Sequence, residues 1–288
     1  MRNTFIKHLV QEARTDKSII LIVGDLGFNV VEPFQTEFPD RFFNAGISEQ
    51  SMASMAAGMA SEGYKVFIYS IANFPTFRCA EQIRNDICYH NLDVTIVSVG
   101  GGLAYGNLGY SHHAIQDYGL MRLFPEISII SPGDPHEVKK CMDFIFADNN
   151  PKYLRLRKAG ELQISNYDNN IDPGHWQPIL IKNPKKILLS TGYGLKIAND
   201  LSFKSKYKDF SIYSCPIWGQ KYASKQIENL KLFDTIVTVE DHLNSGGFGS
   251  WLAENIKDHT NKVESIYIDN SVIGMVGDEG YLLNKNMK

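Results

Sequence analysis

Glu49 is a titratable residue in an unusual setting. It follows the segment Phe43–Ser48 and lies in the first turn of a helix that the small residues predict over Ser48–Ser61. A glutamate at this position can simply be a solvated side chain favoured by the positive end of the helix dipole. However, its neighbours are almost all apolar or small, so we expect little water around the carboxyl group.

Two aromatic residues lie a short distance further along the chain. Phe74 and Phe77 come just before a second predicted helix, Arg78–Tyr89, which also carries charged and amide side chains. The two rings can belong to a plain hydrophobic core. Alternatively, they form one wall of a pocket for a flat heterocycle.

A glycine-rich loop with histidines behind it is the third candidate. The loop covers Gly100–Gly109 and follows the strand predicted over Val94–Val99, and His112 and His113 come directly after it. In open parallel sheets, ligands bind at the carboxyl ends of the strands. The spacing therefore places titratable side chains where a ligand site is expected.

Strands and helices alternate along the chain, which predicts an α/β fold of two doubly wound domains with mainly parallel sheets. Residues 164–184 are rich in Asn, Asp, Gly and Pro without periodicity, and we interpret them as a linker between domains 1–163 and 185–288. The predicted strands are Ser18–Val23, Val66–Tyr69, Val94–Val99, Ile127–Ile130, Lys186–Ser190, Ser211–Tyr213, Thr235–Val239 and Ser265–Ile268. Further helices are predicted over Pro135–Phe146, Leu195–Leu201 and Phe248–Ile256.

Composition excludes several classes of protein. The chain has 288 residues and a net charge of −3, and its lysines and arginines are scattered, which argues against nucleic acid or an anionic membrane as a partner. The apolar run Ile19–Val23 is too short for a membrane span or a signal-peptide core. The four cysteines form no CxxC pair, so we expect reduced thiols in a cytoplasmic protein.

Familiar catalytic motifs are missing from the sequence. It contains no HExxH, GxSxG or Walker A pattern. Gly192-Tyr193-Gly194 follows a predicted strand but lacks the third glycine of a dinucleotide-binding fingerprint, so we interpret it as a tight turn.

Taken together, these segments resemble the C-terminal half of a transketolase, namely its pyrimidine-binding domain and its small final domain. The resemblance begins at Gly24-Asp25-Leu26-Gly27 and extends to the last predicted strand. The matching strings, in the family's order and spacing, are FNAGISEQ (43–50), RCAEQIRN (78–85), the long segment 111–137 and TVEDHLNSGGFGSWLAENI (238–256).

The resemblance implies thiamine diphosphate as the cofactor, which would supply the carbanion chemistry while the protein orients it. Family members have a glutamate at the position of Glu49 that hydrogen-bonds a nitrogen of the aminopyrimidine ring. A histidine at the position of His112 contacts substrate hydroxyls and helps to transfer protons. These two are the implied catalytic residues, and the other implied cofactor contacts are Asp25, Ile71, Phe74 and Phe77.

The family also places an arginine that grips the substrate phosphate near the end of the strand Lys152–Arg157. Arg155 and Arg157 both fit this position, and the resemblance does not decide between them. The same segment can also be an edge strand at the surface, whose arginines reach out to water.

Two positions depart from the family pattern. Gly100 stands where some transketolases carry a histidine for the substrate phosphate. Leu108 replaces the aspartate of a Gly-Glu-Asp-Gly string that recognises a sugar hydroxyl. We therefore expect transfer of a two-carbon ketol unit from a ketose to an aldehyde acceptor that is a modified sugar, such as a nucleotide-linked or otherwise unusual one.

The chain also lacks the GDG motif with which the family binds the diphosphate and its metal ion. Diphosphate and Mg²⁺ or Ca²⁺ need preorganised oxygen ligands. We therefore expect no metal site in this chain and predict an N-terminal transketolase subunit as partner, which would hold the diphosphate and metal in an α₂β₂ assembly.

Three other interpretations stay open at this point. The β-subunit of a 2-oxoacid dehydrogenase shares the two-domain plan and the glutamate, although the segment from His112 to Arg122 fits transketolase better. Deoxyxylulose phosphate synthase is a further relative, which normally carries all its domains in one chain. A catalytically degenerate half, kept as a binding or regulatory module, is the alternative that is not an enzyme.

Overall fold

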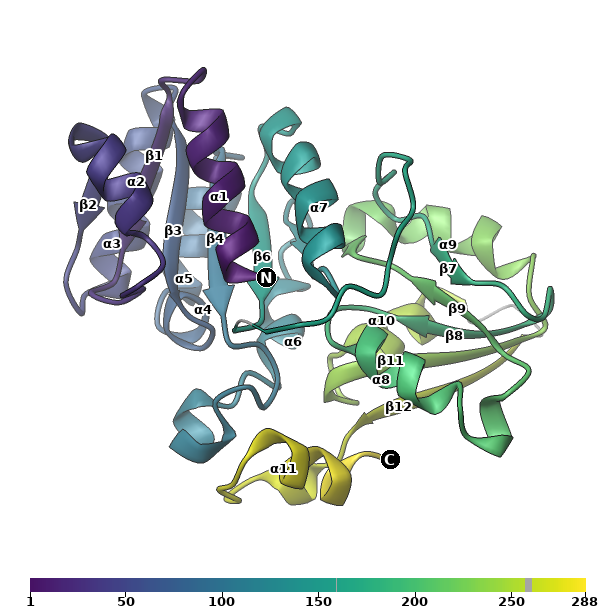
Figure 1. The fold of residues 1–288 in the computed structure, drawn as a ribbon. Coiled ribbons are helices and arrows are strands. Elements are labelled where there is room, and N and C mark those ends of the chain that lie inside the picture. The colour runs from purple at the N-terminus through teal and green to yellow at the C-terminus, as the bar shows by residue number, and fades with distance from the viewer. Residues whose placement is uncertain (159, 257–260) are drawn as a thin grey trace.

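The structure is a computed structural model that describes residues 1–158, 160–256 and 261–288. It contains two sheets of mostly parallel strands that lie side by side (Figure 1). The strands of the first sheet are β1 (Ile19–Val23), β2 (Phe42–Asn44), β3 (Lys65–Ile71), β4 (Val94–Val99), β5 (Ser128–Ile130), β6 (Lys152–Leu156) and β10 (Ile217–Trp218). Those of the second are β7 (Gln177–Leu180), β8 (Lys186–Ser190), β9 (Ser211–Ser214), β11 (Thr235–Leu243) and β12 (Lys262–Ile268).

Helices cover both faces of the first sheet, whose strand order is β10-β5-β6-β4-β3-β1-β2. One face carries α1 (Arg2–Ala13), α2 (Glu32–Glu37) and α7 (Pro135–Ala147). The other face carries α3 (Glu49–Ser61), α4 (Phe74–Phe77), α5 (Ala80–Gln82) and α6 (Asp117–Met121). Both the strand order and the alternation of strands with helices confirm the predicted doubly wound α/β fold.

Strand β1 shows why an apolar run folds this way. Ile20 and Ile22 pack into the cluster on the α3 side of the sheet, whereas Ile19, Leu21 and Val23 pack into the cluster on the α1 side. Successive side chains of a strand point to opposite faces, so a strand covered on both faces has to be apolar throughout.

Strand β6 contradicts the expectation of an edge strand at the surface. It lies between β4 and β5, and all of its residues are buried. The arginine side chains do not need water because acidic side chains from other elements neutralise them. Those partners are distant in sequence, so the strand looks exposed when it is considered alone.

The second sheet has the order β12-β11-β8-β9-β7 and is covered by α8 (Gly194–Leu201), α9 (Ala223–Leu230) and α10 (Phe248–Glu254). The stretch interpreted as a linker contains β7, which pairs antiparallel with β9 at the edge of this sheet. Pro178 lies in β7, and proline is tolerated in an edge strand because its missing N–H costs no ladder bond. Conversely, β10 belongs to the second half of the chain by sequence but pairs antiparallel with β5 of the first sheet.

Several segments differ from the predicted elements, among them the following two. The helix predicted over Arg78–Tyr89 begins only at Ala80 as α5, and it continues as a π-helical segment over Ile83–Cys88. A helix that was not predicted, α11 (Glu279–Asn286), begins at Asp278, whose carboxylate accepts the backbone N–H of Tyr281. A capped start of this kind satisfies one of the free N–H groups of the first turn.

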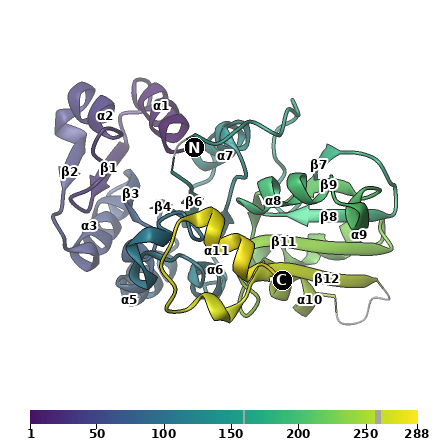
Figure 2. The same ribbon diagram turned by 60° about the horizontal axis from the view of Figure 1, so that its bottom comes forward.

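The C-terminal segment lies against the glycine-rich loop of the first half, in front of α6 and β6 in Figure 2. The backbone N–H of Gly277 donates to the carbonyl of Gly106 at 3.3 Å. A small apolar cluster joins the two segments and includes Leu103, Ile115 and Leu282. The end of the chain therefore supports the loop that carries the histidines.

No helix in the part of the chain that the structure describes has both the length and the apolar character needed to cross a membrane.

Candidate functional site

Glu49 lies at the first position of α3 and is almost completely buried, with 3% of its surface exposed. Its Oε2 accepts a hydrogen bond from Nη1 of Arg78 at 3.0 Å. No described residue bonds to Oε1, so one carboxylate oxygen is left for another partner. A Cβ at Gly24 would lie 3.7 Å from the Glu49 side chain, which shows how closely the end of β1 approaches this carboxyl group.

A buried hydroxyl next to this carboxyl group also lacks a partner. The Oγ of Ser70 has no hydrogen bond in the described structure and would lie 3.4 Å from a Cβ at Gly24. Buried polar groups are normally satisfied, so this hydroxyl is free to bond a water or a ligand.

Phe74 and His112 are connected to Glu49 through Arg78. The guanidinium carbon of Arg78 lies 4.2 Å above the centre of the Phe74 ring, and the His112 ring meets Phe74 edge to face at 5.4 Å between centres. The structure thus brings Glu49, Phe74 and His112, which are separated by 63 positions in the sequence, into one connected group.

His112 is suited to proton transfer at neutral pH. Burial lowers its pKa, and the neighbouring His113 and Arg78 lower it further. The imidazole is therefore mostly neutral near pH 7 and can accept a proton. Its Nδ1 lies 3.0 Å from the Ser111 hydroxyl, which leaves Nε2 as the nitrogen available for a substrate.

Asn73 holds the backbone around His112. Its Nδ2 donates to the carbonyls of Ser111 at 3.2 Å and of His113 at 2.9 Å. These two bonds tie the loop to the end of β3, the strand that also leads to Phe74. The histidine is therefore positioned by the same element as the aromatic ring it contacts.

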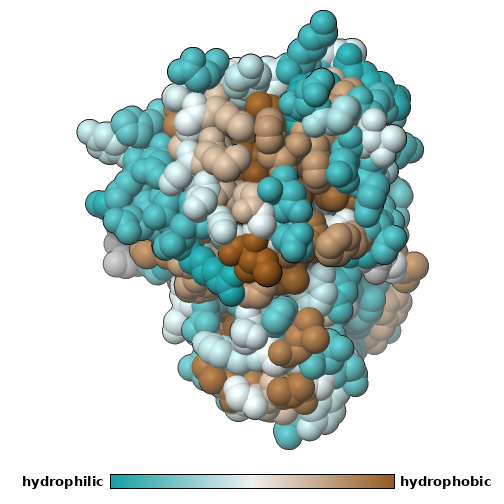
Figure 3. Space-filling view, turned by 90° about the vertical axis from the view of Figure 1, so that its left-hand side faces the viewer, coloured by the Kyte–Doolittle hydropathy of each residue, from teal (hydrophilic) through white to brown (hydrophobic). Residues whose placement is uncertain are grey.

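A cavity of about 440 Å³ opens at Glu49 and is lined by residues 47–51 together with Arg78. Apolar side chains gather on this side of the molecule, which carries α3 and the glycine-rich loop (Figure 3). Ile47, which lines this cavity, is one of the exposed apolar residues of the chain, as are Phe77 and Leu108. A flat, partly apolar molecule that also needs a carboxyl group fits this combination.

The remaining predicted cofactor contacts lie near strand ends and not in direct contact with Glu49. Asp25 is exposed after β1 and exchanges two hydrogen bonds with Asn44, at 3.0 and 3.1 Å. Ile71 ends β3 and is partly buried, and Phe77 is 46% exposed. Their roles toward a cofactor stay predictions.

Arg155 and Arg157 do not join the group around Glu49. Arg155 is buried and bonded inside the chain. Arg157 pairs with Glu279 and stacks on Tyr193, with 3.5 Å between its guanidinium carbon and the ring centre. It lines a second cavity of about 560 Å³ that shares no lining residue with the cavity at Glu49.

The structure explains the glycine at position 100. Gly100 has φ of +92°, and a Cβ there would collide with the ring of Tyr105. A histidine at this position would therefore require Tyr105 to move. Leu108, the second departure from the family pattern, is 52% exposed on the loop.

Arg78 is the site residue that sequence reasoning missed. The string RCAEQIRN contains it, but a cation at the start of a helix gives no sign of the carboxylate it will meet. Its position directly after Phe77, within a segment already singled out for its aromatic rings, was the available signal.

The residues present fit the ring part of thiamine diphosphate. Glu49 offers a carboxyl group at a cavity, and Phe74, which contacts Arg78, offers an aromatic ring next to that ion pair. Among the described residues, no group of three or more His, Cys, Asp or Glu side chains could hold a metal ion.

Comparison with known proteins agrees with this geometry. The family described as transketolase, pyrimidine binding domain, matches residues 1–160. A subunit of the apulose-4-phosphate transketolase of Actinobacillus succinogenes is 30% identical over 262 residues, which cover 90% of this chain and 84% of that protein. A protein of Methanocaldococcus jannaschii described as a transketolase C-terminal section is 31% identical over 286 residues, covering 98% and 90%.

A solved structure shows the same arrangement of both halves. It is a split-gene transketolase described as an inactive β₄ tetramer, and it superimposes with a TM-score of 0.83 at 27% identity over 99% of this chain and 92% of that one. The matches extend well beyond the pyrimidine-binding domain into the second half of the chain. The chain belongs to the transketolase family and corresponds to its C-terminal section.

Proposed function

We propose that this chain binds the aminopyrimidine ring of thiamine diphosphate and forms half of an enzyme that transfers a two-carbon ketol unit from a ketose to an aldehyde. The observation that carries the proposal is the buried carboxyl group of Glu49, which lines a cavity, has one oxygen without a partner among the described residues and is connected through Arg78 to Phe74 and His112. Membership of the transketolase family supports the reaction class.

The residues of this chain would divide the work as follows. Glu49 would offer Oε1 for a hydrogen bond to the ring, and Phe74 would pack on the ring face. When bound, thiamine diphosphate supplies the carbon nucleophile that cleaves the ketose. The neutral Nε2 of His112 would accept or return a proton at a substrate hydroxyl.

Arg78 makes Glu49 responsive to a ligand. Its side chain is 48% exposed, so its ion pair with Glu49 is partly screened by water. A ring that hydrogen-bonds Glu49 therefore competes with a contact that is easily exchanged.

The diphosphate and its Mg²⁺ or Ca²⁺ would be held by a second chain, an N-terminal transketolase subunit, in an α₂β₂ assembly. The missing GDG motif supports this division. So do the relatives, one of which is named as a subunit and another as a C-terminal section. The β₄ tetramer of the split-gene relative is described as inactive, which agrees with a need for the other subunit.

The substrate would be a small sugar or sugar derivative outside the usual set. Gly100 and Leu108 remove two side chains that the family uses for phosphate and hydroxyl recognition, and a histidine at position 100 does not fit beside Tyr105. A relative named for apulose 4-phosphate supports an unusual sugar. Arg157 stays the candidate for contact with a substrate phosphate, because Arg155 has no free donor.

The test uses the complex reconstituted with the N-terminal subunit and a panel of ketoses and aldehydes. Glu49→Gln should lower ketol transfer by about 10²-fold to 10⁴-fold, the usual contribution of a positioned acid or base. Glu62→Gln, at the exposed far end of the same helix, is the matched control and should leave turnover unchanged. Full activity of Glu49→Gln, or tight binding of thiamine diphosphate by the single chain, would contradict the proposal.

A further inference from the structure

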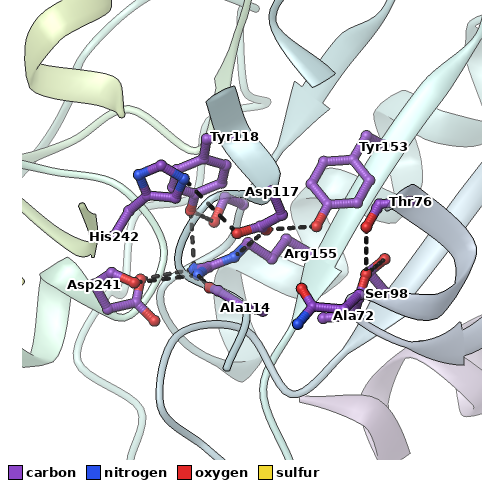
Figure 4. A network of polar contacts seen from close by, with 12 residues as sticks. Ala72, Thr76, Ser98, Ala114, Asp117, Tyr118, Tyr153, Arg155, Asp241 and His242 are labelled. Atoms are coloured by element: carbon purple, nitrogen blue, oxygen red, sulfur yellow. Dashed lines mark hydrogen bonds and ion pairs between the residues drawn. The ribbon is translucent and has the colours of Figure 1, made fainter. Parts of the chain in front are cut away.

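Arg155 lies at the centre of a polar network between the two sheets (Figure 4). Its side chain is 2% exposed. Nε donates to Oδ2 of Asp117 at 2.7 Å, and Nη1 donates to Oδ1 of Asp241 at 2.7 Å and to the Tyr118 hydroxyl at 3.1 Å. Nη2 donates to the carbonyls of Ala114 at 2.8 Å and of Asp241 at 3.2 Å. These bonds use all five N–H groups of the guanidinium.

The saturated guanidinium cannot also grip a substrate phosphate. Asp117 and Asp241 are both fully buried, and each forms an ion pair with Arg155. A phosphate would have to displace one of them and leave a buried carboxylate without its partner, which is strongly unfavourable. Arg155 therefore needs an explanation other than substrate contact.

The network reaches the loop that carries His112 at the base of that loop. Gly102 and Ala114 pair backbone to backbone, with N–O distances of 2.8 and 2.9 Å. The Ala114 carbonyl, already bonded to Gly102, also accepts Nη2 of Arg155. The loop of residues 103–113 is thus closed at its base by one backbone pair, Gly102 with Ala114. Arg155 stabilises this pair through its hydrogen bond to the Ala114 carbonyl.

The glycines at the start of the loop lie directly against the network. A Cβ at Gly101 would lie 2.7 Å from the guanidinium carbon of Arg155. Gly102 has φ of +67°, and a Cβ there would collide with Oδ2 of Asp241. The side chains of Arg155 and Asp241 therefore pack directly against the backbone of these glycines. A shift of either side chain would displace the start of the loop.

The second sheet also contacts the base of the loop, through strand β11. Asp241 and Leu243 both lie on β11, and the backbone N–H of Leu243 donates to the carbonyl of Ile115 at 3.0 Å. His242, between them, stacks on Tyr118 with 5.0 Å between ring centres. Strand β11 therefore contacts the base of the loop through Asp241 and Leu243, and it contacts α6 through His242.

We propose that Arg155 is a positioning residue, which fixes the base of the loop so that His112 stays against Phe74, and which links this geometry to the second sheet through Asp241. The inference rests on the proposed function for the role of His112 in the reaction. The link between Arg155 and the order of the loop can be measured without any turnover.

Two variants and one control test the inference. Arg155→Lys keeps the charge but loses the planar fork that reaches two carboxylates and two carbonyls. Asp241→Asn keeps Arg155 paired with Asp117 and removes the carboxylate of the second sheet. Arg122→Met is the matched control, because the ion pair of Arg122 with Glu254 at 2.6 Å also joins the two halves of the chain but does not touch the loop.

Hydrogen exchange on the full chain is the first measurement. Amide exchange at residues 111–115 should speed up by about 10-fold in Arg155→Lys and Asp241→Asn, and it should stay unchanged in Arg122→Met. The NMR signals of the His112 ring should report the same release. Its pKa, which burial lowers, should rise toward the usual histidine range in the two variants.

Kinetics of the reconstituted complex are the second measurement. In both variants kcat should fall by about 10-fold to 100-fold with little change in the affinity for thiamine diphosphate, since the cofactor contacts at Glu49 stay intact. If both variants fold and their amide exchange rates at residues 111–115 equal those of the wild type, the inference is overturned. If Arg155→Lys does not fold, the exchange rates of Asp241→Asn alone decide the question. A wild-type complex without turnover, combined with faster exchange in the variants, overturns the proposed function and supports the positioning role.

Discussion

Glu240 should make the stability of this chain fall as pH rises. It is fully buried, and its two carboxylate oxygens accept the backbone N–H groups of Phe248 at 2.7 Å and Gly249 at 2.8 Å at the start of α10. A Cβ at Gly247 would collide with Oε2, and one at Gly249 would lie 3.2 Å from Oε1. Gly247 and Gly249 therefore allow the backbone at the start of α10 to pack closely around the buried carboxyl group of Glu240.

Burial raises the pKa of Glu240 to about 8, although the two backbone N–H groups draw it partly back. The unfolded chain releases this proton near 4.5 and the folded chain only near 8, so the folded state holds an extra proton in between. Stability from this group is complete below about pH 4.5 and is lost as pH rises through 8. At about 1.4 kcal/mol per pKa unit, the interval corresponds to roughly 5 kcal/mol of unfolding free energy.

The perturbation is Glu240→Gln, which is uncharged at every pH and keeps one acceptor oxygen for the two backbone N–H groups. Urea unfolding, followed by tryptophan fluorescence at several pH values between about 5 and 8, gives the free energy of unfolding of both proteins. The wild type should lose stability relative to Glu240→Gln by several kcal/mol across this range. Other titrating groups are common to both proteins, so they cancel in the difference.

Glu254→Gln provides the control, because it removes a half-exposed carboxyl group from the last residue of the same helix. Its difference from the wild type should depend only weakly on pH. A difference between wild type and Glu240→Gln that is constant from pH 5 to 8, or that moves in favour of the wild type, would refute the reasoning.

Two further predictions concern buried charges and thiols. Asp93 pairs with Lys65 at 2.6 Å and with the fully buried Lys152 at 2.8 Å, so Asp93→Asn should lower the unfolding free energy by about 3 kcal/mol. Glu37→Gln, which breaks an exposed ion pair, should have a much smaller effect in the same urea titration, and equal effects would contradict the assignment. All four cysteines are buried, and burial raises the pKa of each thiol, so a thiol reagent should label none in the folded chain and all four in urea; rapid labelling of the native protein would show that the packing is wrong.

Most elements of the fold could be predicted because their signal is local. The apolar run of β1 and the small residues of α3 show their structure within a few residues of themselves. The antiparallel edge strands could not be found in this way. Strand β7 contains a proline and lies in a polar stretch, and β10 has only two residues, so their pairing with β9 and β5 depends on segments far away.

The same distinction between local and long-range signals applies to the candidate site. Glu49, Phe74 and His112 stand in strings whose order and spacing resemble a known family, and the structure places them in contact through Arg78. The ion pair between Arg78 and Glu49 spans 29 positions, and no periodicity in the sequence reports it.

The sequence by itself determined the α/β class, the family resemblance and the carboxyl group at the start of α3, because each depends on residue types at short spacing. Only the tertiary structure decided what Arg155 does. Its carboxylate partners lie 38 and 86 positions away, and a guanidinium on a strand is a surface group or a buried one according to whether such partners surround it. Burial of a charge is thus a property of the assembled fold, since the free energy of leaving water is offset only by groups that folding brings from elsewhere in the chain.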